Sequence, residues 1–360
     1  MARARRPPPE PVPPAGLTRD EFLAWRAPRL GTANPERLTN PVWSWLVRER
    51  LNAWAANKAF DGPSSLGGSP CWCNTRFGQS RTALEDGRTI LIGGEHEDYY
   101  DPDFFIYNDV IVTDATGAIE IYGYPRDVFP PTDFHSATLD GDRIVIVGCL
   151  GYTDQRARGT TPVYALALGD LSIARLETTG DAPGWIYEHA ATRDGEALVV
   201  RGGMRYDGTR LVESFDDWAL DLGTLRWTRS SARPWSIWQL VRTDGKSNKL
   251  FDITSYALYE HGRDKAVERI GFTPDIAQVT ERYAPPMMHV AQPPHEDDDF
   301  RVHRIEVAGV VVRYTEDMAY VTVTIEGELP EATVDALIDD ARRKLSAIER
   351  TEYVARRIVP

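Results

Sequence analysis

Between residues 75 and 229 the apolar residues recur in short runs that are separated by turns rich in Asp and Gly. Short apolar or alternating runs bounded by such residues are typical of β-strands. One pattern occurs three times: a polar lead-in, an Asp-Gly turn, an apolar run and a glycine-rich stop. Its turns, Asp86-Gly87, Asp140-Gly141 and Asp194-Gly195, follow one another at intervals of 54 residues. A fixed period of this size indicates repeated supersecondary units.

Each copy contains four runs, which predict four short antiparallel strands. In the first copy the lead-in at 80–84 is followed by 89–92, 109–112 and 119–122. In the second the lead-in at 135–139 is followed by 143–147, 163–166 and 173–176. In the third the lead-in at 189–192 is followed by 197–200, 218–221 and 225–227. Residues 75–234 are therefore predicted to form three small sheets.

Three features of these copies resemble kelch-type β-propeller repeats, over residues 75–230. They are a double glycine after an apolar strand, a lead-in of His, Ser or Ala, Ala and Thr, and an aromatic residue near the fourth strand. These features are carried by Gly93-Gly94, Gly202-Gly203, His135, His189, Tyr122 and Trp227. The second copy departs from the pattern with Gly148-Cys149. The resemblance implies propeller blades, a fold that serves mostly as a binding platform and occasionally as an enzyme.

The number of copies leaves the closure of the array open. Closed propellers have four or more blades, and only three copies are recognisable. Either residues 40–75 and 235–290 supply diverged blades, or the array is open and capped by helices; we favour the second. The expected fold is mostly β: a kelch-like β-propeller of three recognisable blades, incomplete or open, with N-terminal helices and a small C-terminal α+β module.

The N-terminal residues predict a tail and then helices. Residues 1–16 are rich in proline and are expected to be a disordered tail. Within 17–74, the residues Thr18-Arg19-Asp20-Glu21 form a capping box before a short helix. Asn40-Pro41 opens a second helix, whose apolar stripe runs to Trp54 and which we expect to lie on the propeller.

The C-terminal part is predicted to begin with an irregular or helical connector over 235–299, which includes a short helix within 274–283. Residues 300–360 follow as a small α+β module. Its strands are expected at 302–307, 310–314 and 320–325, followed by a helix with an apolar face from Val334 to Ile348 and a closing strand at 353–359. One helix on so small a sheet is marginally stable alone, so we expect this module to pack on the rest of the chain.

The composition indicates a globular protein of 360 residues, with 42% hydrophobic and 26% charged residues. Its net charge of −13 argues against a nucleic-acid partner and suits a basic one. No apolar run of about 18 residues occurs, so no membrane span is expected and we predict a cytoplasmic protein. Only five of its 41 basic residues are lysines, a bias of GC-rich coding that suggests a bacterial source.

The most polar segment follows the first double glycine. It carries five carboxylates and a histidine within residues 95–103, ligands that suit calcium or a transition metal. Its spacing matches no metal-binding loop, so we favour a solvated acidic loop and expect neither metal nor cofactor. An acid and base pair of carboxylates is the alternative for this loop.

The equivalent loops of the three copies are expected to emerge on one face of the array. Together they combine carboxylates, arginines and tyrosines, a mixture typical of protein-binding surfaces. The predicted contact residues are Glu95, His96, Glu97, Asp98, Tyr99, Tyr100, Asp101, Tyr152, Asp154, Arg156, Arg158, Arg205, Tyr206 and Asp207.

The remaining polar motifs favour structural roles. Cys71 and Cys73 are separated by one residue rather than the two of a zinc knuckle, and a third cysteine, Cys149, leaves an odd number. His135 and His189 occupy one repeat position, so we expect each to hold a turn by a hydrogen bond rather than to act in catalysis. No nucleophile elbow, P-loop or dinucleotide fingerprint occurs.

The sequence therefore favours a cytosolic protein-binding module without catalytic activity, which uses the loop face of the propeller. An immunity or antitoxin-like protein that covers a basic toxin is one concrete version. Two alternatives remain: an enzyme or sugar-binding propeller with a carboxylate or metal site at 95–103, and a structural scaffold of an assembly.

Overall fold

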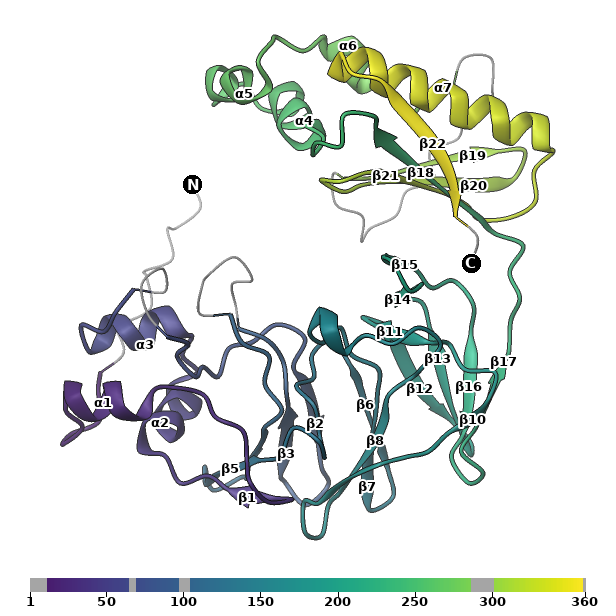
Figure 1. Ribbon diagram of the computed structural model, residues 1–360. Coiled ribbons are helices and arrows are strands. Elements are labelled where there is room, and N and C mark those ends of the chain that lie inside the picture. The colour runs from purple at the N-terminus through teal and green to yellow at the C-terminus, as the bar shows by residue number, and fades with distance from the viewer. Residues whose placement is uncertain (1–11, 65–68, 97–103, 286–300, 359–360) are drawn as a thin grey trace. The chain divides into compact units, whose positions relative to one another are not determined.

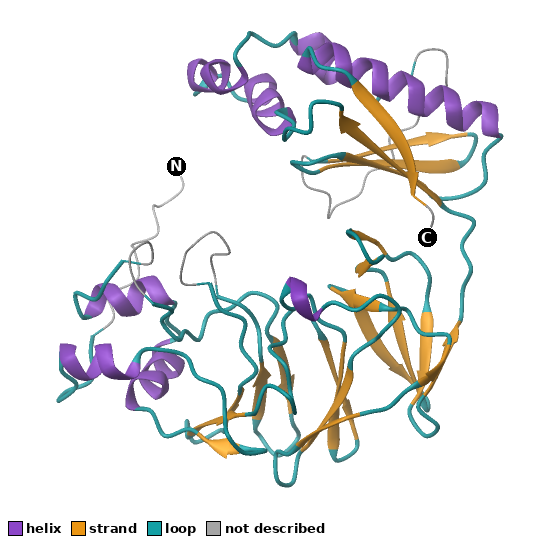
Figure 2. Ribbon diagram, in the orientation of Figure 1, coloured by secondary structure: helices purple, strands orange, loops and turns teal. Residues whose placement is uncertain are grey.

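The structure is a computed structural model that describes residues 12–64, 69–96, 104–285 and 301–358. The chain divides into two compact units, Met1–Ala232 and Arg233–Pro360. Over the described residues the fold is mostly β, with several antiparallel sheets and a few helices, as the strand patterns predict (Figure 2). None of the described helices is long and apolar enough to cross a membrane.

The three copies of the sequence pattern each form a four-stranded antiparallel sheet, and the three sheets stand side by side (Figure 1). The first contains β2 (Ser80–Ala83), β3 (Thr89–Ile92), β4 (Val110–Thr113) and β5 (Ile119–Gly123). The second contains β6 (Ser136–Asp140), β7 (Arg143–Val147), β8 (Val163–Ala167) and β9 (Ile173–Arg175). The third contains β12 (Ala190–Asp194), β13 (Ala197–Arg201), β16 (Trp218–Asp221) and β17 (Arg226–Arg229). The predicted four strands per copy are confirmed.

Short strands extend this arrangement. β1 (Glu36–Arg37) joins the first sheet on β5, and β10 (Thr179–Gly180) runs parallel to β17 in the third. β11 (Trp185–Tyr187), β14 (Met204–Tyr206) and β15 (Leu211–Glu213) form a separate small sheet, and η1 (Thr153–Gln155) is a single 3₁₀ turn. The sequence pattern did not predict these pieces, because two or three residues are too few to show a period.

Alternation along β7 explains how the sheets stack. Ile144 and Ile146 belong to a buried cluster shared with the first sheet. Val145 and Val147 belong to a second cluster shared with the third sheet. Because successive side chains of a strand point to opposite faces, the middle sheet is buried on both faces, and its strands read as continuous apolar runs.

The two outer faces of the stack of sheets differ in what covers them. Helices α1 (Arg19–Trp25), α2 (Pro41–Glu49) and α3 (Ala53–Ala59) share a buried cluster with the outer face of the first sheet, where Trp43 stacks on Trp72 at 5.1 Å between ring centroids. The outer face of the third sheet is polar and carries the ion pair of Arg201 with Asp217, 3.4 Å apart. No buried cluster of described residues joins the first sheet to the third. Neither 40–75 nor 235–290 forms a fourth sheet of this kind within the described ranges.

The N-terminal helices begin as predicted but divide differently. Thr18 and Glu21 cap α1 reciprocally, and the Asn40 side chain accepts hydrogen bonds from the first turn of α2. The single helix expected from Asn40 onwards is wrong, because Arg50 adopts a left-handed conformation and Asn52 caps α3. Residues 1–11 of the predicted tail lie outside the described residues. The Val12 carbonyl, within the same tail, accepts a hydrogen bond of 3.2 Å from the Trp45 indole.

The second unit is one antiparallel sheet with helices. Its elements are β18 (Ser236–Arg242), α4 (Leu250–Leu258), α5 (Arg263–Ile270), α6 (Ile276–Thr280), β19 (Val302–Val307), β20 (Val310–Glu316), β21 (Val321–Ile325), α7 (Glu331–Glu349) and β22 (Tyr353–Ile358). The strand order is β19-β20-β21-β18-β22. The apolar face of α7, with Leu337, Ala341 and Leu345, packs on Val321 and Val323 (Figure 1).

Two predictions for this unit need correction. The irregular connector over 235–299 contains β18, which pairs with both β21 and β22 and is the strand that joins them. The unit therefore begins near Arg233 rather than at residue 300. The strand escaped detection because it is apolar on both faces, with Ile237 on one and Leu240 on the other, and its partners lie more than 80 residues later.

Candidate functional site

The backbone aligns the three repeats residue by residue at one end of the sheets. In each repeat, the residue after the glycine stop pairs with a residue of a lead-in, two positions before His135, His189 or the equivalent Gln79. Glu95 N–H donates to Phe77 O at 2.8 Å, and Leu150 N–H donates to Asp133 O at 3.1 Å. Met204 pairs with Tyr187 in the same way. Equivalent positions are therefore Glu95, Leu150 and Met204 on one side, and Phe77, Asp133 and Tyr187 on the other.

Two carboxylic acids replace apolar residues at these positions, and they meet. Repeat one carries Glu95 where the other repeats have Leu and Met, and repeat two carries Asp133 where the others have aromatic rings. Gly94 N–H donates to Thr132 O at 2.8 Å, which holds the two segments together. The Glu95 carboxyl lies close enough to Asp133 for the charge of each to act on the other. Asp133 is fully buried and Glu95 is 7% exposed.

Repeat three adds a third carboxylate. Glu188 precedes His189 and adopts a left-handed backbone, φ 54°, as Phe134 does before His135 with φ 48°. Glu188 N–H donates to Phe134 O at 2.9 Å, so the two lead-ins lie against each other. The Glu188 side chain is exposed. We call Glu95, Asp133 and Glu188 the carboxyl cluster; it runs from solvent at Glu188 to the interior at Asp133.

The environment favours protonation of this cluster. Burial, then the charge and hydrogen bond of Asp133 and the charge of Glu188, raise the pKa of Glu95 to about 8. Burial raises the pKa of Asp133 as well, although the Gly151 N–H at 2.6 Å favours its ionised form. Partial burial and the charge of Asp133 raise the pKa of Glu188. Glu95 is therefore the protonated donor to Asp133 at neutral pH, and the negative charge of the cluster is incompletely compensated.

Arg156 is the cation that acts on Asp133. Its guanidinium donates to Leu150 O at 3.0 Å and to Gly151 O at 3.1 Å, so two of its N–H groups are taken by carbonyls. Within the described ranges no ion pair involves any member of the carboxyl cluster. The site therefore has a deficit of positive charge.

The other predicted contact residues of the first two loops differ in how exposed they are. Glu97, Asp98, Tyr99, Tyr100 and Asp101 lie outside the described residues. His96 is 1% exposed, so its side chain offers no contact surface here. The Tyr152 hydroxyl accepts a hydrogen bond of 2.9 Å from Ile106 N–H, which connects the first loop to the second. Asp154 and Arg158 are exposed.

The third loop is a hairpin rather than an open loop. Arg205 and Tyr206 lie in β14, and the Asp207 carboxylate accepts hydrogen bonds from Thr209 N–H and Arg210 N–H within the turn. The Arg158 side chain lies against Gly208, so the second and third loops are neighbours. The structure thus brings together the described parts of the three loops, but Asp207 is occupied in its own turn.

Sequence reasoning missed Asp133 and Glu188. Both stand just before a histidine that marks the repeat, so extending the repeat alignment two residues upstream would have exposed them. The two histidines themselves connect neighbouring sheets: His135 Nε2 lies 2.8 Å from Ser80 Oγ, and His189 Nε2 lies 2.9 Å from Ser136 Oγ. Burial lowers the pKa of His135 to about 3 and that of His189 to about 4, so both are neutral at pH 7.

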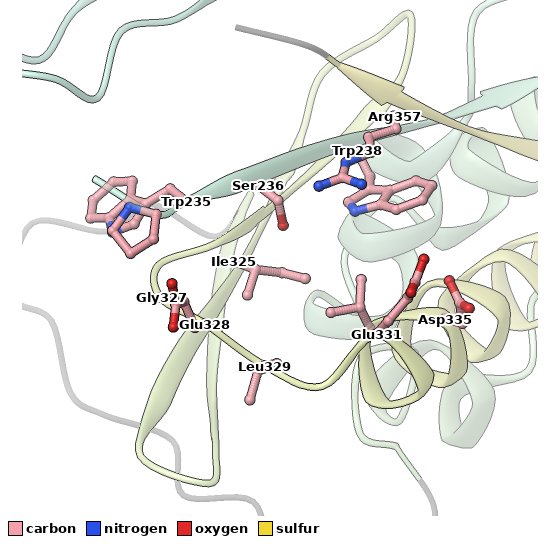
Figure 3. Close-up of a pocket in the computed structure, with 12 residues that line it drawn as sticks. Trp235, Ser236, Trp238, Ile325, Gly327, Glu328, Leu329, Glu331, Asp335 and Arg357 are labelled. Atoms are coloured by element: carbon pink, nitrogen blue, oxygen red, sulfur yellow. The ribbon is translucent and has the colours of Figure 1, made fainter. Parts of the chain in front are cut away.

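A second candidate site lies in the C-terminal unit, in a pocket of about 600 Å³ between the sheet and the first turns of α7 (Figure 3). The Trp238 ring forms part of its wall, with the Arg357 guanidinium 5.8 Å from the ring centroid. The acidic side chains that line it are Glu328, Glu331 and Asp335. None of these three carboxylates forms an ion pair with a described residue.

The chemistry of both sites is that of carboxylates. Among the described residues no three His, Cys, Asp or Glu side chains are placed to hold a metal ion. Cys71, Cys73 and Cys149 are buried thiols that form no disulfide. What the two sites share is a group of carboxyl side chains that form no ion pair with a described residue.

Comparison with known proteins identifies no family for the chain. No protein-family model and no curated protein matches the chain. One similar solved structure is that of YjhT, with 13% sequence identity and a TM-score of 0.31. The similarity covers 48% of this chain and about half, 55%, of that one.

Proposed function

We propose that the three sheets are consecutive blades of an open, kelch-like array, and that this array is a platform for protein binding. The fixed repeat interval, the stacking of blade on blade, and the glycine stops that contact the next lead-in support this interpretation. The helices cover one outer face and polar residues line the other, so the array needs no ring closure to bury its core.

The partner that we propose is a basic protein, bound by the loop ends of the blades. One observation carries this proposal: Glu95, Asp133 and Glu188 come from three different repeats, lie at one end of the sheets, and form no ion pair with any residue that the structure describes. A lysine or arginine side chain that enters the cluster supplies the missing charge and displaces the proton of Glu95. An immunity or antitoxin-like role, in which the protein covers a basic toxin, is the form of this function that we favour.

The pocket of the C-terminal unit suits the same partner. Glu331 and Asp335 lie on the same side of the pocket as the Trp238 ring, and Glu328 lies at its other end (Figure 3). Aromatic faces with nearby carboxylates bind ammonium and guanidinium groups. We propose that it accepts a second basic side chain.

The test is calorimetric titration of the full chain with an octalysine peptide at pH 7.5 and low salt. Asp133→Asn and Glu188→Gln keep the shape of the site and are expected to weaken binding by about tenfold each, the effect of losing one charge-assisted contact. Glu85→Gln, in an exposed turn of the first blade, is the control and should change the affinity by less than about twofold.

Proton release provides a second readout from the same titration. Binding to the wild-type chain should release a proton, detected as a heat that depends on the ionisation enthalpy of the buffer, and Glu95→Gln should abolish this dependence. Equal affinities for the wild type and both cluster variants, without proton release, would exclude the cluster as the binding site.

Acid–base catalysis is a second candidate function. It is favoured by the proximity of the Glu95 and Asp133 carboxyls, because a carboxyl with a raised pKa beside a second carboxyl can provide an acid and a base. A screen of nitrophenyl glycosides that finds turnover in the wild type, and loses it in Glu95→Gln with peptide binding retained, would favour the enzyme. Absence of turnover with retained octalysine binding would favour the platform.

A further inference from the structure

The helical cap leaves part of the first sheet uncovered, and a pocket of about 470 Å³ lies there. Its floor is apolar and consists of Leu91 and Ile119 from the sheet with Val47 from α2. Pairing of Arg81 with Leu91 and of Thr113 with Thr89 places these side chains on the face that the helices cover. The lining residues are Val47, Arg48, Arg50, Asn74, Gln79, Arg81, Leu91, Thr113, Gly117 and Ile119.

Three arginines from two separate elements line this pocket. Arg48 and Arg50 come from the last turn and the C-cap of α2, and Arg81 comes from β2. No ion pair with a described residue involves any of the three, and no carboxylate lines the pocket. In a chain with 54 acidic and 41 basic residues, carboxylates are abundant, so a pocket with three arginines and no carboxylate is a local reversal of charge.

Two amide side chains add polar groups at the same place. The Gln79 amide N–H donates to Gly93 O at 3.3 Å, which fixes that side chain. The Asn74 side-chain oxygen is shielded from solvent and has no hydrogen-bond partner among the described residues. A ligand that carries a hydroxyl or amino group beside its charge can satisfy this oxygen.

We propose that this pocket binds a small organic anion, a carboxylate or phosphate monoester with an apolar body. The arginines supply charge and N–H donors that match the oxygens of such groups, and the floor of Val47, Leu91 and Ile119 buries the body. The site is independent of the proposed carboxyl cluster, because it uses the opposite charge and lies on the outer face of the first blade.

The experiment is calorimetric titration of the full chain with phenyl phosphate and with benzoate at pH 7.5. Benzamide, which lacks the charge, and inorganic phosphate, which lacks the apolar body, serve as reference ligands. We expect the two organic anions to bind and both references to bind at least about tenfold more weakly, because each loses one of the two contributions.

The double variant Arg48→Gln, Arg81→Gln should weaken phenyl phosphate by about tenfold or more. Arg226→Gln removes an exposed arginine of the third sheet and is the control, with an expected change below about twofold. Both substitutions lie at the surface, and equal melting temperatures verify that the variants are folded. Wild-type protein that binds neither organic anion at millimolar concentration, or an equal loss in the Arg226 control, would overturn the proposal.

Discussion

The protonation of Glu95 makes a direct prediction about the pH dependence of stability. In the folded chain the pKa of Glu95 is raised from 4.5 to about 8 by burial and by the neighbouring carboxylates. Between these values the folded chain holds a proton that the unfolded chain has lost. The free energy of unfolding therefore falls as the pH rises through this window. Glu95→Gln, which keeps the size and a hydrogen-bond donor to Asp133, should remove this dependence.

The size of the effect follows from the two pKa values. Each pH unit inside the window costs about 1.4 kcal/mol. Between pH 5 and pH 7.5 the wild type should lose about 3 kcal/mol relative to Glu95→Gln, with the proton shared across the Glu95 and Asp133 pair. The variant should thus be more stable than the wild type at pH 7.5 and close to it at pH 5.

Urea-dependent hydrogen exchange, read by mass spectrometry on peptides that cover β3 and β7, measures this difference in the first unit alone. The difference between variant and wild type at each pH cancels the titration of the groups that do not interact with Glu95. Glu85→Gln, at an exposed position, should show no such divergence. If the curves of Glu95→Gln and the wild type stay parallel from pH 5 to pH 7.5, Glu95 does not hold a proton in the folded chain, and the reasoning fails.

Three further predictions concern the repeats. His135→Gln introduces the residue that repeat one carries at the equivalent position, Gln79. Because the pKa of His135 is lowered to about 3 in the folded chain, the wild type loses stability as the pH falls below 6.5. In acid unfolding, the variant should be more stable than the wild type by roughly 2–3 kcal/mol at pH 4.5. Gly203→Ala would place a Cβ 2.4 Å from Tyr187 O and should lower the free energy of unfolding by roughly 3 kcal/mol in urea. Gly202→Ala, with open space around its Cβ, should lower it by about 1 kcal/mol. Equal losses in the two variants would contradict the close approach at Gly203. Asp109→Asn breaks the buried ion pair with Arg76, whose nitrogen lies 2.5 Å from the carboxylate, and should lower the free energy of unfolding by about 3–5 kcal/mol. Glu120→Gln, in the exposed pair with Arg37, should lower it by less than about 1 kcal/mol. Similar melting temperatures for the two variants would refute this prediction.

Local sequence signals were sufficient to predict the strands of the repeats and the start of the first helix. The run Arg143–Val147 is β7 as predicted, because its four consecutive β-branched residues, Ile144 to Val147, lie between turns and strongly favour a strand. The capping box of Thr18 and Glu21 fixed the start of α1 for the same reason: its hydrogen bonds lie within four residues. β18 shows the opposite case, since its place between β21 and β22 depends on partners far along the chain.

The sequence alone therefore determined the four strands of each repeat, their repetition and the acidic character of the chain, since each of these depends on neighbouring residues or on composition. Only the tertiary structure decided which charges meet. Glu95, Asp133 and Glu188 are far apart in the sequence and belong to different repeats. The raised pKa of Glu95 arises from their proximity and burial, which no local pattern encodes. The arginine pocket has the same origin: Arg48 and Arg81 come together because α2 covers only part of the first sheet.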